Sequence, residues 1–242
     1  MDENLVARYP ELERRHFWWA TRRNLVRTLF RTWFPSGSAR VLDVGCGSGV
    51  TAEAIAEEGA EVVGVDLEIP AAGSGAKSLQ RISGDYLELG PGLGEFDLVM
   101  ALDVVEHFEN EGQILRALVS NTRPGGKILV TVPAYQWLWS THDVQNDHHR
   151  RYTRRQLAQA LQTFGAEVDN VGYLFLGLVP PKALLAIYER IRSRSAPSGT
   201  GVVGAMNALA GKYFGIEAWC AMRLPNFLPA GTSVIAVAHR PG

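Results

Sequence analysis

The chain has 242 residues, of which 46% are hydrophobic and 20% are charged, and its formal net charge is −1. This size and composition fit one α/β domain with an elaboration and a full hydrophobic core. A near-neutral charge argues against nucleic acid as a partner, because neutralising phosphates requires a basic surplus. Two cysteines make no disulfide framework, and neither an apolar leader nor an apolar run of about 18 residues is present, so we expect a cytoplasmic protein.

Strand-type and helix-type segments alternate from residue 40 onward, which predicts an α/β fold with a doubly wound, mostly parallel sheet of seven strands. The crossover at 67–77 is expected to be short or irregular, because it contains glycines and a proline. Helices are predicted at 11–34, 50–58, 109–121 and 153–164, with two more in 180–224. The expected strands are 40–44, 61–65, 79–83, 96–102, 127–132, 166–175 and 232–239.

We therefore predict a single domain over residues 1–242. An N-terminal helical lid takes residues 1–36, and the core runs over 37–179. A helical insertion with a loop at 193–201 occupies 180–224, and the last strand lies in 225–242.

A glycine-rich turn follows the first predicted strand. Residues 41–49 read Val-Leu-Asp-Val-Gly-Cys-Gly-Ser-Gly, and Asp66 ends the next strand. Glycines allow the backbone to approach a ligand closely, and an acid at that strand end suits the two hydroxyls of a ribose. A dinucleotide-binding loop would have its third glycine where Val50 stands, and no P-loop lysine follows.

This loop resembles motif I of the class I, Rossmann-like S-adenosylmethionine-dependent methyltransferases. Further segments resemble the same family in the same order: Gly84-Asp85-Tyr86, the strand at 96–101 with Asp103-Val104-Val105-Glu106-His107 after it, and Pro124-Gly125-Gly126. The N-terminal His16-Phe17-Trp18-Trp19 and the downstream His-Arg-Arg-Tyr resemble a bacterial small-molecule methyltransferase subgroup. The resemblance implies S-adenosyl-L-methionine as the cofactor.

By this resemblance, Asp66 binds the ribose, Asp85 accepts a hydrogen bond from the adenine amino group, and Leu67 and Tyr86 flank the adenine. Asp43 orients the glycine loop or meets the methionine ammonium. Cys46 is interpreted as a small loop residue and not as a nucleophile. The complete expected cofactor site is Trp18, Arg22, Asp43, Gly45, Cys46, Gly47, Gly49, Asp66, Leu67, Asp85, Tyr86, Ala101, Leu102 and His107.

Two interpretations of the N-terminal segment stay open. In the first, which the resemblance to the bacterial subgroup implies, Trp18 covers the cofactor and Arg22 meets its carboxylate with a planar guanidinium. In the second, the segment is an amphipathic helix that packs its aromatic side chains on the sheet and exposes its arginines.

The segment after the fifth strand holds the candidates for acceptor chemistry. A neutral imidazole is suited to remove a proton near neutral pH, so we expect His142, His148 or His149 as a base, with Asp143 or Asp147 orienting His142. The expected substrate contacts are Tyr135, Trp139, Arg150 and Arg151. A structured loop that binds the lid is the alternative, and a metal site built from His142, Asp143, His148 and His149 is not favoured, so no metal is expected.

The insertion bears on the substrate. Apolar residues recur at helical spacing between 184 and 191, beside several basic residues. Such a face can line an apolar acceptor pocket, rest peripherally on an anionic membrane, or cover the sheet.

The function predicted is methyl transfer to a small-molecule acceptor, hydrophobic or lipid-linked, with oxygen favoured over nitrogen or carbon. The alternatives are a non-catalytic S-adenosylmethionine-binding or partner-binding protein and a nucleotide-dependent oxidoreductase. The sequence leaves the oligomeric state open.

Overall fold

The computed structural model describes residues 13–69, 78–192, 205–223 and 228–242. Seven strands form one sheet in the order β3-β2-β1-β4-β5-β7-β6, and β7 alone runs antiparallel to its neighbours. The predicted doubly wound, mostly parallel seven-stranded sheet is therefore confirmed. The strands are β1 (Arg40–Val44), β2 (Glu61–Asp66), β3 (Leu79–Ser83), β4 (Phe96–Leu102), β5 (Thr122–Pro133), β6 (Glu167–Leu174) and β7 (Ser233–His239).

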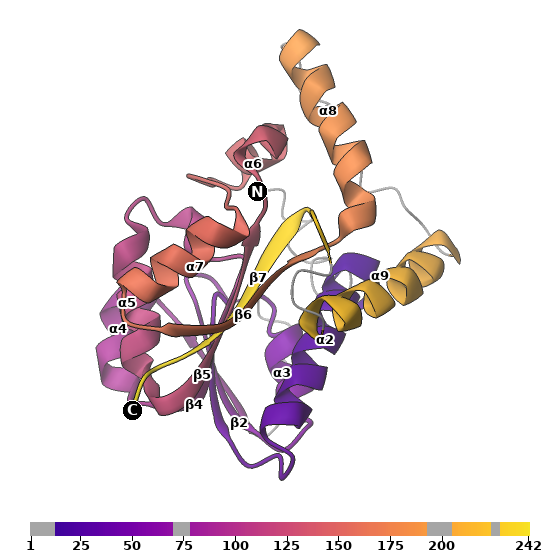
Figure 1. The fold of residues 1–242 in the computed structure, drawn as a ribbon. Helices are drawn as coiled ribbons and strands as arrows, with labels where there is room; N and C mark the ends of the chain where they lie inside the picture. Colours follow the sequence, from indigo (N-terminus) through magenta and orange to yellow (C-terminus); the bar gives the residue numbers. More distant parts are fainter. Residues whose placement is uncertain (1–12, 70–77, 193–204, 224–227) are drawn as a thin grey trace.

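Helices cover both faces of this sheet (Figure 1). Three of them, α4, α5 and α7, lie on one face, while α2, α3 and α9 lie on the other. The α-helices are α2 (Phe17–Trp33), α3 (Val50–Ala56), α4 (Tyr86–Leu93), α5 (Glu111–Asn121), α6 (Thr141–Gln145), α7 (Arg154–Thr163), α8 (Val179–Arg192) and α9 (Ala205–Arg223), with 3-10 turns η1 (Val105–His107), η2 (Gln136–Leu138) and η3 (Leu176–Leu178).

The core lies along the two central strands, where both faces of the sheet are covered. Leu98, Val99 and Met100 of β4 have no exposed surface, and neither do Ile128 and Leu129 of β5. Continuous apolar runs are what a parallel strand needs when helices cover it on both sides. The sheet is thus a rigid base for the loops at its carboxyl edge.

Two helices were not predicted. The first, α4, contains Pro91, and Asp85 caps it by accepting from the backbone N–H of Leu87 at 2.8 Å. The second, α6, lies in the segment expected to be a loop and begins after Ser140, whose backbone N–H donates to the Asp143 carboxylate at 2.9 Å. Most of the crossover at 67–77 and the loop at 193–201 fall outside the described residues.

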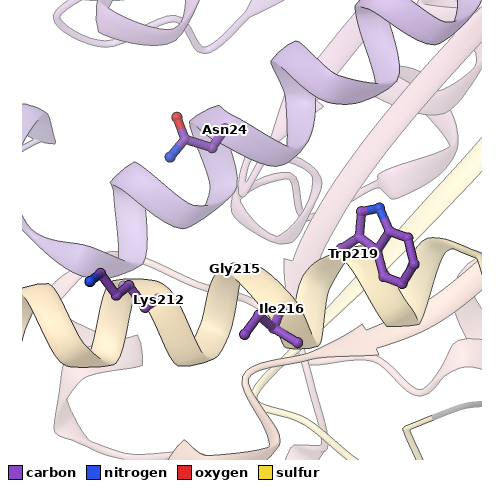
Figure 2. Close-up of a pocket in the computed structure, with 6 residues that line it drawn as sticks. Asn24, Lys212, Gly215, Ile216 and Trp219 are labelled. Atoms are coloured by element: carbon purple, nitrogen blue, oxygen red, sulfur yellow. The ribbon is translucent and has the colours of Figure 1, made fainter.

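The two helices of the insertion behave differently. Phe214 of α9 is buried and stacks on Phe17 of α2 with ring centroids 5.3 Å apart. On the outer side, Ile216 and Trp219 of α9 line a groove with Asn24 of α2 (Figure 2).

By contrast, α8 projects from the body of the molecule (Figure 1). Leu184 is 69% exposed and Ile191 is 77% exposed, so this apolar face does not cover the sheet, contrary to one of the sequence interpretations. Neither α8 nor any other helix in the described ranges has the length and hydropathy to cross a membrane.

Candidate active site

A cleft of about 300 Å³ opens at the carboxyl edge of the sheet, beside the ends of β1, β2 and β4. The connections from β1 and β4 leave toward opposite faces, and open α/β sheets bind ligands at such a switch point. Non-glycine residues adopt a positive φ at this edge: Asp103 after β4 (58°), Tyr135 after β5 (56°) and Phe175 after β6 (64°). Backbone strain of this kind concentrates at functional sites.

The glycine loop forms one side of the cleft. Gly45 has a φ of 68°, and a Cβ there would lie 2.3 Å from the side chain of Val104. Gly47 has a φ of 55°, and its backbone N–H donates to the Asp66 carboxylate at 2.7 Å. Both glycines and Asp66 line the cleft. The predicted glycine loop and the predicted ribose-binding acid are therefore joined by a hydrogen bond in the ligand-free chain.

Helix α2, which belongs to the predicted N-terminal lid, covers part of the cleft. Trp18 and Arg22 of α2 both line it, and the guanidinium lies over the indole ring at 4.7 Å. Arg22 forms an ion pair with Asp103, so part of its guanidinium is engaged within the chain. Its Nε is buried and has no hydrogen-bond partner in the described part of the structure.

Buried polar atoms without partners gather around this cleft. Besides Arg22 Nε, they include the Oγ1 of Thr232 and both carboxylate oxygens of Glu106, and all three residues line the cleft. Buried polar groups are normally hydrogen-bonded, so these atoms indicate a polar ligand. Together with the glycine cradle, Arg22 Nε and Thr232 Oγ1 fit a nucleoside with a charged amino-acid tail.

Two residues beneath the glycine loop have shifted pKa values. Burial raises the pKa of Asp43 from 3.8 to about 7, with Arg22 opposing the shift and Asp66 and Glu13 adding to it. Burial also raises the pKa of the Cys46 thiol, which packs against Gly64. A neutral, buried thiol agrees with the interpretation of Cys46 as a small loop residue.

Several residues expected at the cofactor do not line the cleft. The Tyr86 ring is buried, and its hydroxyl donates to Asn121 Oδ1 at 2.8 Å, so it packs between α4 and α5 and does not flank the cleft. Ala101 is fully buried within β4, and Gly49 caps α3 outside the cleft. Asp85 is the exposed cap of α4, and Leu67 is 70% exposed just after β2.

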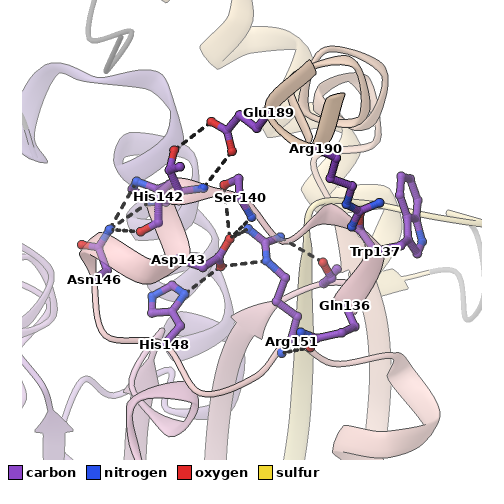
Figure 3. Close-up of polar contacts among 12 residues, drawn as sticks. Gln136, Trp137, Ser140, His142, Asp143, Asn146, His148, Arg151, Glu189 and Arg190 are labelled. Carbon is purple, nitrogen blue, oxygen red and sulfur yellow. Dashed lines mark hydrogen bonds and ion pairs between the residues drawn. The ribbon is translucent and has the colours of Figure 1, made fainter. Parts of the chain in front are cut away.

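The opposite side of the cleft is built on Asp143 (Figure 3). The carboxylate accepts two hydrogen bonds from Arg151, from Nε and Nη2, both at 2.8 Å, and one from His148 Nδ1 at 2.9 Å. Burial alone would raise the pKa of Asp143, but the hydrogen bonds from His148 and Arg151 outweigh it and hold the pKa well below its ordinary value. This corrects the prediction for Asp143, because it orients His148 and not His142.

The two arginines expected to bind substrate have structural partners. Arg151 is 4% exposed, and its guanidinium is held by Asp143 and the carbonyl of Ala134. Arg150 donates to the carbonyl of Phe108 at 3.1 Å and lies outside the cleft. Both side chains anchor the segment, although their partners do not belong to the N-terminal lid that the alternative interpretation named.

Of the remaining candidates for acceptor chemistry, some line the cleft and others do not. His142 and His148 line the cleft, whereas His149 is exposed and does not line it, so the prediction of His149 as a base is corrected. Tyr135 stacks on Tyr173 at 5.0 Å between ring centroids, and neither it nor Trp139 lines the cleft.

Sequence reasoning missed three cleft residues. Lys182 of α8 reaches the cleft, and burial lowers its pKa to about 8. Asp103 pairs with Arg22, and Glu106 is fully buried at the base of the cleft. Burial, reinforced by Asp103, raises the pKa of Glu106 well above its ordinary value. The Asp-x-x-Glu-His pattern was visible in the sequence, but only the packing shows that Glu106 is buried.

This fold is that of the class I methyltransferases, and comparison with known proteins gives the same family. The family described as "Methyltransferase domain" matches residues 9–171. The chain therefore belongs to this methyltransferase-domain family. At the level of the family, the prediction of a methyltransferase and of S-adenosylmethionine as its cofactor is confirmed.

Individual relatives and solved structures are also methyltransferases by name. The ubiquinone biosynthesis O-methyltransferase of Pseudomonas aeruginosa is 28% identical over 148 residues, which is 54% of this chain and 63% of that protein. The chain thus matches less than two thirds of that relative's length. A SAM-dependent methyltransferase from Archaeoglobus fulgidus has the same fold, with a TM-score of 0.56 at 21% identity over 89% of this chain and 93% of that one. The complex between the Haloferax volcanii Trm112 methyltransferase activator and the methyltransferase gives 0.63 at 16% identity, over 99% and 96%.

Proposed function

We propose that this protein transfers a methyl group from S-adenosylmethionine to a hydroxyl oxygen of a small molecule. One observation carries the proposal: a single cleft joins the glycine loop and Asp66 on one side to His142, His148 and Lys182 on the other. A bound cofactor and an acceptor would therefore lie next to each other in a partly closed space. The name of the relatives, ubiquinone biosynthesis O-methyltransferase, favours oxygen as the methylated atom.

The cofactor supplies an activated methyl group on a sulfonium, and the protein supplies position and a place for the proton. Gly45 and Gly47 would admit the cofactor, Asp66 would hold its ribose hydroxyls, and Trp18 and Arg22 would cover its amino-acid end. With the cofactor bound, the cleft would align the acceptor oxygen with the sulfonium methyl group. The hydroxyl proton passes to an imidazole of the cleft, His142 or His148.

The acceptor would place a polar group in the cleft, because Lys182, His142 and His148 face it there. An apolar portion could extend along the exposed face of α8, where Leu184 and Ile187 are 69% and 51% exposed. This arrangement supports a hydrophobic or lipid-linked acceptor with a polar head. Peripheral membrane contact through α8 stays a prediction.

The test is single-turnover methyl transfer from radiolabelled S-adenosylmethionine to a panel of phenols, catechols and aliphatic alcohols, some with apolar tails. We expect label in an oxygen-linked product together with release of S-adenosylhomocysteine. If S-adenosylhomocysteine binds but no acceptor is labelled, the non-catalytic alternative is favoured. If NAD stabilises the protein against heat more than S-adenosylhomocysteine does, the oxidoreductase alternative is favoured.

A further inference from the structure

Three side chains of types that can ligate a metal converge at the base of the cleft, and one of them, His107, was also expected at the cofactor. Glu106 and His107 belong to η1, directly after β4, and His148 follows α6. One carboxylate oxygen and one ring nitrogen from each histidine lie within 4.8 Å of one another. The two imidazole rings are 4.7 Å apart and nearly perpendicular, at 85°.

A backbone contact places these segments. The backbone N–H of His149 donates to the carbonyl of Glu106 at 2.8 Å, and the backbone N–H of His148 donates to the carbonyl of Asp143 at 2.9 Å. These bonds fix His148 opposite η1. The neighbouring His149 side chain, one residue further along, is exposed and has no part in the cluster.

Glu106 supplies an independent indication of a ligand. Its side chain is 0% exposed, and neither carboxylate oxygen has a hydrogen-bond partner in the described part of the chain. Arg22 pairs with Asp103 and Arg151 pairs with Asp143, and neither guanidinium hydrogen-bonds to the Glu106 carboxylate. A buried carboxylate that lacks a partner is costly, and a cation would satisfy it.

The orientation of His148 is that of a metal ligand. Its Nδ1 is hydrogen-bonded to Asp143 Oδ1, which leaves Nε2 available to the cleft. Metal-binding histidines almost always bond their other ring nitrogen to a carboxylate or carbonyl, which fixes the tautomer and raises ligand basicity. Here Arg151 and Ser140 hold that carboxylate in turn.

We propose that Glu106, His107 and His148 bind one divalent transition-metal cation at the base of the cleft. Two imidazoles and one carboxylate suit zinc, cobalt, manganese or iron better than magnesium or calcium, which prefer oxygen ligands. Ligand atoms around a tetrahedral zinc lie about 3.3 Å apart, so the three side chains close by small rotations on binding. Three protein ligands leave a coordination position open toward the cleft.

The open position gives the cation a place in the proposed function. A cation there could bind the acceptor oxygen and ease the loss of its proton. With His148 engaged as a ligand, His142 is the imidazole of the cleft that stays free to accept this proton. The binding itself depends on no methyl transfer and can be measured without cofactor or acceptor.

The experiment is titration of the chelator-treated full-length protein with Zn²⁺ by calorimetry and with Co²⁺ by visible absorption. We expect one equivalent of each metal and a Co²⁺ ligand-field band. Glu106→Gln, His107→Ala and His148→Ala should each weaken binding at least 10-fold and reduce the band. His149→Ala, which removes an adjacent exposed imidazole, should bind as the unmodified protein does.

His107 is exposed, so its replacement leaves the core intact and keeps the test valid if the Glu106 variant does not fold. Absence of stoichiometric binding by the unmodified protein would overturn the site. Unchanged binding by both His107→Ala and His148→Ala would do the same. Calorimetry with S-adenosylhomocysteine on the same samples separates this outcome from a failure of the proposed function.

Discussion

Arg22 on α2 forms an ion pair with Asp103, the residue that directly follows β4. This pair ties the N-terminal helix to the switch point of the sheet across 81 residues of sequence. It places one guanidinium where the methionine end of the cofactor is expected. Arg22 Nε stays buried without a partner in the described residues, so the side chain can still take an anion.

We predict that Arg22→Ala weakens S-adenosylhomocysteine binding by about 1–3 kcal/mol, the size expected for a lost charge-assisted contact. Isothermal titration calorimetry measures this directly. The matched control is Arg27→Ala on the same helix, because Arg27 pairs with Glu58 away from the cleft. Equal affinities in the two variants would remove Arg22 from the cofactor site.

Asp66→Ala should also weaken S-adenosylhomocysteine binding by about 1–3 kcal/mol. The carboxylate has two tasks, since it holds the backbone N–H of Gly47 and faces the expected ribose. Glu68→Ala is the control, because this nearby acid has an exposed side chain. Calorimetry showing the same affinity for the Asp66 variant and the unmodified protein would contradict the ribose assignment.

The parts of the site that the sequence predicted are those fixed by local pattern. A strand, a glycine turn and an acid at the next strand end place Gly45, Gly47 and Asp66 with no knowledge of distant contacts. The identity of the partner of Asp143 was not predicted, because it depends on how residues 140–151 fold. A signal existed: Ser140 and Asp143 have the spacing of a capping box, which predicts the start of α6.

Burial explains the other errors. The motif pattern places Tyr86 after β3 but does not show that α4 and α5 pack around it. The pattern likewise reveals Glu106 and His107 but not their proximity to His148. That proximity arises from the backbone hydrogen bond between His149 and Glu106, which joins segments about 40 residues apart in the sequence. The apolar spacing of α8 was read correctly as helical, yet spacing alone does not show which face stays exposed.

Asp43 should make the stability of the ligand-free protein depend on pH. Its pKa is about 7 in the folded chain and 3.8 as the ordinary value, so the folded state binds the proton more tightly. Stability contributed by the neutral carboxyl is therefore lost as pH rises from about 4 through 7. Arg22 opposes this shift, whereas Asp66 and Glu13 enlarge it.

Urea unfolding of the unmodified protein and Asp43→Asn between pH 4.5 and 8 isolates this contribution. We expect the difference in unfolding free energy to move in favour of the Asn variant by about 2–4 kcal/mol across this range, from about 1.36 kcal/mol per pKa unit. A difference that stays constant with pH would show that Asp43 is ionised throughout.

Arg151 and Arg150 provide a paired test of how the segment after β5 is held in place. Arg151→Ala leaves the fully buried Asp143 with only His148 and Ser140 as partners, and breaking a buried ion pair typically costs about 3–5 kcal/mol of unfolding free energy. Arg150→Ala removes a partly exposed contact and should cost about 1 kcal/mol or less. Chemical unfolding of both variants measures the contrast, and equal losses would contradict the structural role of Arg151.

His142→Ala should lower turnover about 100-fold or more while leaving S-adenosylhomocysteine affinity unchanged, because general base catalysis typically contributes at least that factor. Burial, together with Lys182, lowers the pKa of His142, so its imidazole is neutral and able to accept a proton near neutral pH. The side chain lines the cleft on the side opposite the glycine loop, so its loss should spare the cofactor. His149→Ala removes an exposed imidazole seven residues away and is the control. The measurement compares kcat and cofactor affinity in the two variants. Equal kcat values would exclude His142 as the base. A large loss of cofactor affinity in the His142 variant would place this histidine in the cofactor site instead.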